Sequence, residues 1–164
     1  MHVSPAFVAD EHAWVRERAP VVVALVNDVR ADLGDAFDTT VAPVSEAQYL
    51  DAVDAVFADG DLAVNVAAIV ALLRDLDVDG DYPGFVVDEL LGRELAGMLA
   101  GNQPLRLLGE ATFHYADVQT HYDDGSAGLD DLDAALAAGF QTRLPGWEWV
   151  ADGSPFAVGR DGGV

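Results

Sequence analysis

The sequence contains no lysine and no cysteine. Without cysteine the chain has no disulfides, no thiolate zinc site and no cysteine nucleophile. Without lysine it can form neither a Schiff base nor a complete phosphate-binding Gly-x-x-x-x-Gly-Lys loop. Its eight arginines are scattered, and they are too few to form the cationic surface that binding to a nucleic-acid backbone needs. These absences exclude several enzyme classes and direct nucleic-acid binding.

Acidic residues dominate the charged side chains. There are 22 Asp and 7 Glu, which give a net charge of −21 and a pI near 4.1. Such a charge destabilises a compact state by self-repulsion, unless salt shortens the range of that repulsion. The excess of Asp and the lack of Lys resemble the composition of proteins from salt-in haloarchaea. This resemblance implies a halophilic cytosolic protein.

The chain nevertheless has enough apolar residues to fold. Hydrophobic residues make up 51% of it and the mean hydropathy is +0.18, whereas acidic disordered chains combine charge with low hydrophobicity. A length of 164 residues predicts one domain. The first residues, Met1 to Pro5, show no secretory signal, and the most apolar run, 62–73, is too short to span a bilayer. We therefore expect a cytoplasmic protein without a membrane segment.

Helix signals recur along the first part of the chain. Ser4 and Pro5 are typical of an N-cap and a first helical residue, and this helix is predicted to run to about Arg18. Pro20 restarts the pattern, and Gly34 is placed to end the second helix. Ser45 followed by Gln48 predicts a capping box that opens a third.

The run 62–73 is apolar at nearly every position. A helix of this kind is predicted to be buried all round and to form the centre of the fold, with a partner inside for its one amide, Asn65. Further helices are predicted at 85–99, at about 105–122 and from Leu129 to Leu136. The prediction is an all-α, single-domain bundle of about six to seven helices.

The chain changes character after residue 144. The bundle is predicted to span residues 1–144, and residues 145–164 form an irregular or hairpin-like aromatic tail packed on the same domain, with a turn signal at Asp152-Gly153. Trp147, Trp149 and Phe156 have two interpretations. Exposed, they form a binding site for a protein partner; packed on the bundle, they are a clasp that adds buried area.

The loop between two predicted helices resembles the first half of an EF-hand. Asp75, Asp77 and Asp79 alternate before Gly80, and Asp81 follows. Position 12 of the motif, where a bidentate Glu belongs, is Val86, so any binding of calcium or magnesium is expected to be weak. The alternative is a solvated loop in a chain rich in Asp.

A second candidate metal site lies on the helix predicted at 105–122. Glu110, His114, Asp117 and His121 fall within roughly 60° of one face and could hold a transition metal. The apolar residues of this helix centre roughly 110° away, which leaves the four polar residues on its flank or in solvent. These apolar residues are Leu105, Leu108, Ala111, Tyr115, Val118 and Tyr122. Metal binding therefore needs another segment, such as the one with Glu11 and His12, to pack on that flank.

Residues 81–90 carry one further resemblance. The run Asp81-Tyr82-Pro83-Gly84, leading into Val87-Asp88-Glu89-Leu90, is similar to the Pro-Asp-His turn and Glu-Leu helix of the TorD-like chaperones. Gly84 and Phe85 replace the Asp and the His. The resemblance implies an all-helical chaperone of molybdoenzyme maturation.

Two functional hypotheses follow. The first is a non-enzymatic protein that acts through protein–protein contacts, as an adaptor or assembly factor, with self-association also open. The second is a metal-dependent helical-bundle enzyme that uses the face of the 105–122 helix. No Gly-x-Ser-x-Gly motif supports a hydrolase.

The charge balance predicts that folding requires about molar salt. The Debye length falls from about 10 Å at 0.1 M to about 3 Å at 1 M, so repulsion among the carboxylates is largely screened only at high salt. Circular dichroism during dialysis to low ionic strength should show loss of secondary structure. A cooperative melt that does not depend on salt would refute this prediction.

Overall fold

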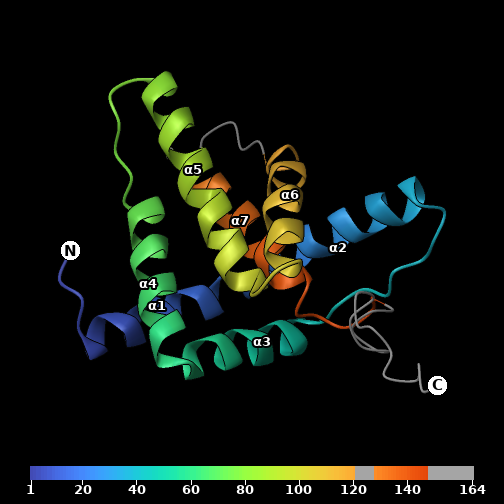
Figure 1. Cartoon of the computed structure of the whole chain (residues 1–164), viewed down its shortest axis with the longest axis horizontal. Coiled ribbons are helices and arrows are strands. Elements are labelled where there is room, and N and C mark those ends of the chain that lie inside the picture. Colours follow the sequence, from blue (N-terminus) through green and yellow to red (C-terminus); the bar gives the residue numbers. More distant parts are fainter. Residues whose placement is uncertain (121–127, 148–164) are drawn as a thin grey trace, which may run out of the picture.

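The chain forms helices throughout the part that the structure describes. This structure is a computed structural model, and it describes residues 1–120 and 128–147. Within those residues there are seven helices and no strand, which confirms the all-α prediction (Figure 1). The helices are α1 (Pro5–Glu17), α2 (Ala19–Ala36), α3 (Glu46–Ala58), α4 (Gly60–Arg74), α5 (Asp81–Ala100), α6 (Leu105–Asp117) and α7 (Leu129–Gln141).

Side-chain caps begin three of these helices. The hydroxyl of Ser4 accepts the Phe7 N–H at 3.1 Å at the start of α1. Both arms of the predicted capping box are present at α3: the Gln48 N–H donates to the Ser45 hydroxyl at 3.3 Å, and the Ser45 N–H donates to the Gln48 amide oxygen at 2.9 Å. These caps satisfy backbone donors that have no partner within the helix.

The second helix continues past the residue predicted to end it. Gly34 lies inside α2, which ends two residues later at Ala36. A side chain at Gly34 would place its Cβ 2.8 Å from the Thr39 carbonyl oxygen, and the Thr39 N–H donates to the Gly34 carbonyl at 2.8 Å. This glycine therefore permits the close return of the following loop rather than ending the helix.

The centre of the fold is α7, not α4. Every residue of α7 from Asp131 to Gln141 is buried. In α4, Val64, Asn65 and Leu72 are exposed, so the prediction of a helix buried all round at 62–73 is wrong, and so is the expected internal partner for Asn65. The long apolar run of α4 covers only one side of the core.

Glycines set the spacing of α5, α6 and α7, which lie together in Figure 1. A Cβ at Gly92 of α5 would lie 2.4 Å from the Phe113 ring of α6. A Cβ at Gly109 of α6 would lie 2.7 Å from the Ala100 Cβ. A Cβ at Gly139 of α7 would lie 2.5 Å from the Leu99 Cβ. The three helices therefore approach more closely than side chains at these positions would allow.

Two arginines of the N-terminal helices satisfy polar side chains of α7. Arg18 donates to both carboxylate oxygens of the fully buried Asp133, at 3.0 and 2.6 Å. Arg30 is itself buried; it donates to the Gln141 amide oxygen and, at 2.7 and 2.6 Å, to the carbonyls of Ala42 and Pro145. Burial lowers the pKa of Arg30 to about 10, still well above neutral pH, so the side chain stays charged.

Among the helices of the described residues, none is by itself long and apolar enough to cross a membrane. The α3 and α4 helices pass the test of length and composition together, but they are bent by 111° with respect to each other at the break between them.

Adding one methyl group at Gly139 should destabilise the fold. Gly139→Ala would force the Cβ against the Leu99 Cβ and the Ala96 carbonyl, and overpacking of this kind costs about 1–3 kcal/mol. The matched control is Gly60→Ala, because a Cβ at Gly60 meets nothing within 4 Å. Denaturant unfolding in molar salt, followed by circular dichroism, measures both. Equal stability of the two variants would contradict the close packing of α5 on α7.

Candidate functional site

The predicted metal ligands on the described part of α6 lie in different surroundings. Glu110 accepts a hydrogen bond from Arg106 at 3.1 Å, and Arg106 also donates to Glu94 of α5 at 2.7 Å. His114 is exposed, and Asp117 is half-buried at the last turn of the helix. His121 lies outside the described residues. Glu110, His114 and Asp117 do not converge on one point, and metal binding by this set stays a prediction.

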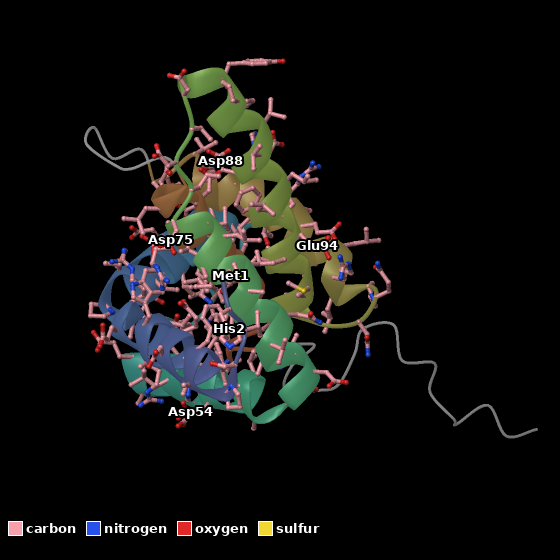
Figure 2. All side chains as sticks on the ribbon, turned by 90° about the vertical axis from the view of Figure 1, so that its left-hand side faces the viewer. Met1, His2, Asp54, Asp75, Asp88 and Glu94 are labelled. Carbon is pink, nitrogen blue, oxygen red and sulfur yellow. The ribbon has the colours of Figure 1, made fainter. Side chains whose placement is uncertain are left out.

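The segment with Glu11 and His12 faces other helices. Arg74 of α4 donates to both carboxylate oxygens of the buried Glu11, at 2.6 and 2.7 Å. The Nε2 of His12 lies 2.7 Å from the Asp54 carboxylate of α3, labelled in Figure 2. Glu11 and His12 therefore pair with residues of α4 and α3, and not with the flank of α6 on which a metal site would have needed such a segment.

The acidic loop joins α4 to α5 as predicted. Asp75 (Figure 2) follows α4 and accepts a hydrogen bond from Arg74 at 3.2 Å, while Asp77 and Asp79 are exposed. Gly80 has a φ of 94°, the left-handed region that glycine adopts readily. The side chain of Asp81 lies outside the described ones. Asp75, Asp77 and Asp79 do not gather within the reach of one ion, and cation binding by the loop stays a prediction.

Trp147, at the start of the aromatic tail, packs on the bundle. It is half-buried, its indole N–H donates to the Gln141 carbonyl at 3.0 Å, and the Arg30 guanidinium lies 5.4 Å from its ring centre. These contacts favour the clasp interpretation for this residue. Trp149 and Phe156 lie outside the described residues.

The apolar face of α6 points away from the core. Side chains predicted on the buried side, Leu108, Tyr115 and Val118, are exposed, so this part of the prediction is wrong. The buried residues of α6 are instead Gly109, Phe113 and Ala116. The physical reason is that small residues and one aromatic ring fit the narrow space beside α5 and α7, which leaves the larger aliphatic residues outside.

An acidic cluster forms where α6 ends and α7 begins. One carboxylate oxygen from each of Asp117, Asp130 and Asp131 lies within 4.8 Å of the other two, and among residues 1–120 and 128–147 these three form the one such group. Asp88 of α5 (Figure 2) is also buried, and its charge is among those that raise the pKa of Asp131. The Glu89 N–H donates to the Asp88 carboxylate at 2.7 Å.

Burial and mutual repulsion make this cluster electrostatically costly. Two unit charges about 5 Å apart repel by about 3 kcal/mol at an effective dielectric constant of about 20. Burial, followed by the charges of Asp117 and Asp88, raises the pKa of Asp131 to about 8. Burial also raises the pKa of Asp88. Without a bound cation, Asp131 is therefore largely protonated at neutral pH.

Three of these four residues were missed by the sequence analysis. Asp117 was predicted as a ligand together with Glu110, His114 and His121 rather than with the residues of this cluster. Because acids are everywhere in this chain, Asp88, Asp130 and Asp131 did not stand out. The usable signal is the position of Asp131 and Asp133 within a helix whose other residues are mainly Leu and Ala.

The comparisons with known proteins identify the family. The profile of DUF7984, a domain of unknown function, matches residues 1–160. The chain belongs to the DUF7984 family. A search of the curated proteins and a search of the solved structures returned no match. The family match assigns no activity, and the resemblance to TorD-like chaperones stays a prediction.

Replacing Asp131 should change how stability depends on pH. A carboxyl whose pKa is raised in the folded state, from about 4 when unfolded, adds stability that is complete below pH 4 and lost as the pH rises towards 8. In chelator and constant molar salt, we therefore expect Asp131→Asn to match the wild type near pH 4. It should become more stable than the wild type by up to about 1.4 kcal/mol for each pH unit between 4 and 8.

Denaturant unfolding at several pH values measures this difference. The control is Asp51→Asn on the exposed side of α3, which should follow the wild type at every pH. A stability gap between Asp131→Asn and the wild type that does not change with pH would contradict the buried, crowded environment of Asp131.

Proposed function

We propose that this protein acts without catalysis, as a cytoplasmic adaptor or assembly factor in a halophilic cell, by binding a helical segment of a protein partner. The observation that carries the proposal is the exposed apolar face of α6, which the core leaves uncovered. It is extended by the first half of α5. The name docking face is used below for the exposed apolar residues along these two helices. They are Leu107, Leu108, Ala111 and Tyr115 of α6, Val118 directly after it, and Tyr82, Phe85, Val86, Val87 and Leu90 of α5.

The α6 part of the docking face is a continuous stripe. Leu107, Ala111, Tyr115 and Val118 follow one another at intervals of four, four and three residues, which places them on one side of a helix. Leu107 is 60% exposed and Val118 is 56% exposed. An open hollow beside the stripe is lined by Ala111, His114, Tyr115, Val118 and Gln119. Such a stripe matches the apolar side of a second helix.

The α5 part of the docking face extends beyond the packed body. In Figure 1 the first turns of α5 stand clear of the neighbouring helices. Tyr82, the most exposed of its large apolar side chains, is 78% exposed, and Phe85 and Leu90 are also exposed. Exposed apolar side chains are ordinary when they occur singly, but a series of them along two neighbouring helices is typical of an interaction surface.

The acidic charge around the docking face favours a basic partner over a second copy of the chain. Each copy carries a net charge of −21, and in molar salt the repulsion between two copies is confined to carboxylates in direct contact. Exposed Asp77, Asp79 and Glu94 lie on or next to α5. Complementarity therefore favours an amphipathic helix whose apolar side is flanked by Arg or Lys.

The metal-dependent enzyme remains a prediction. It requires His121 to join His114, and His121 lies outside the described residues. His114 borders the hollow beside the stripe, where the neighbours are mainly apolar rather than further metal ligands.

A photo-crosslinking experiment tests the proposed function. A photoreactive phenylalanine analogue is introduced in place of Leu107 or Val118, and the protein is expressed in its own cells. We expect both positions to form a discrete adduct with one other protein, and mass spectrometry to place the crosslink in a helical segment with basic flanks. The control position is Asp51 on α3, which should form no such adduct.

A substitution within the docking face tests whether the crosslinked partner binds there. Tyr115→Ser should reduce the adduct at Val118 at least several-fold, because it removes a large apolar contact from the middle of the stripe. Crosslinking to a second copy of the chain, to an acidic segment, or to nothing would overturn the proposed partner.

A further inference from the structure

The buried polar side chains of α7 differ in whether an arginine pairs with them. Asp133 receives two hydrogen bonds from Arg18, and Gln141 receives one from Arg30. Asp131 is only 8% exposed, and its carboxylate lies within 4.8 Å of those of Asp117 and Asp130. None of the ion pairs between described residues involves Asp131. A buried carboxylate in such surroundings requires a proton or a cation.

The carboxylates of the cluster come from two helices, α6 and α7, and α5 brings the buried Asp88 to the same end of α6. Close contacts pair Gly92 of α5 with Phe113 of α6, and this antiparallel register brings Asp88 level with the end of α6. Asp117 is the last residue of α6, while Asp130 and Asp131 lie in the first turn of α7. Because the residues come from separate elements, the cluster is produced by tertiary packing and not by the abundance of Asp in one loop.

The helix termini make the position of Asp117 unusual. A carboxylate at a helix N-terminus is stabilised by the backbone dipoles, which suits Asp130 and Asp131. A carboxylate at a helix C-terminus is disfavoured by the same effect, which applies to Asp117. A cation held between the two ends would interact favourably with all three carboxylates and with the C-terminal end of α6.

We propose that Asp117, Asp130 and Asp131 bind one hard divalent cation, Mg²⁺, Ca²⁺ or Mn²⁺, at the junction of α6 and α7. The donors are carboxylate oxygens without any imidazole or thiolate, which is the set that these ions prefer over zinc or copper. Asp88 is a positioning residue, because it is buried on α5 level with the end of α6. The bound cation links the end of α6 to the beginning of α7.

Direct titration tests the site. The full chain without a histidine tag is treated with chelator and held in molar KCl at pH 7.5, and each of the three cations is added separately. Calorimetry should give one bound ion per chain, thermal melting should shift upwards, and Mn²⁺ should show a bound signal in electron paramagnetic resonance.

Variants distinguish this site from the others in the chain. Asp131→Asn should weaken binding at least tenfold, and Asp117→Asn provides a second test if the first variant changes the fold by circular dichroism. Asp79→Asn in the loop after α4 and His114→Ala on α6 are the controls, and both should bind as the wild type does. Unchanged binding in both Asp131→Asn and Asp117→Asn, or lost binding in either control, would overturn the proposal.

The titration can also show that none of the three cations binds to the wild type. The site is then refuted, and a shared proton is the species that balances the charge of the cluster. This result would leave the docking face untouched, because α6 presents the apolar stripe on its exposed side and the acidic cluster at its end.

Discussion

The burial of α7 is the constraint on which the rest of the structure depends. A helix enclosed from Asp131 to Gln141 must have small residues where its neighbours approach and a partner for every polar side chain. Gly139 meets the first requirement, because Leu99 of α5 lies against it. Arg18 and Arg30 meet much of the second, by reaching from the N-terminal helices to Asp133 and Gln141. Contacts more than 100 residues apart in sequence therefore hold the two ends of the chain together.

Local signals made the helices predictable, but not their arrangement. Ser4 and the pair Ser45 and Gln48 act within four residues, so the sequence alone reveals where α1 and α3 begin. Which side of a helix is buried depends instead on what packs against it. Apolarity favoured α4 as the central helix, yet the helix built from Ala, Gly and Leu, α7, allows the closest approach and occupies the centre.

The same reason explains the partial prediction of the site. Asp117 could be identified from its position on one helix, because helical spacing is visible in the sequence. Asp88 and Asp131 lie 43 positions apart in the printed sequence, and only the close packing of α5, α6 and α7 brings them together. With 29 acidic residues in the chain, no single Asp was distinctive. What distinguishes Asp131 is its burial without a basic partner, which is a property of the fold.

Salt determines which of these interactions matter. At a Debye length of about 3 Å, charges that are not in direct contact scarcely interact, so the net charge of −21 loses most of its reach in the molar salt that we predict the protein to require. Contacts at hydrogen-bond distance, such as Arg18 with Asp133, lose much less, since both groups lie inside the screening length and one is buried. Apolar burial is also not screened by salt. A protein with this composition therefore depends on short-range contacts, and an apolar face on α6 is a surface on which it can still bind a partner.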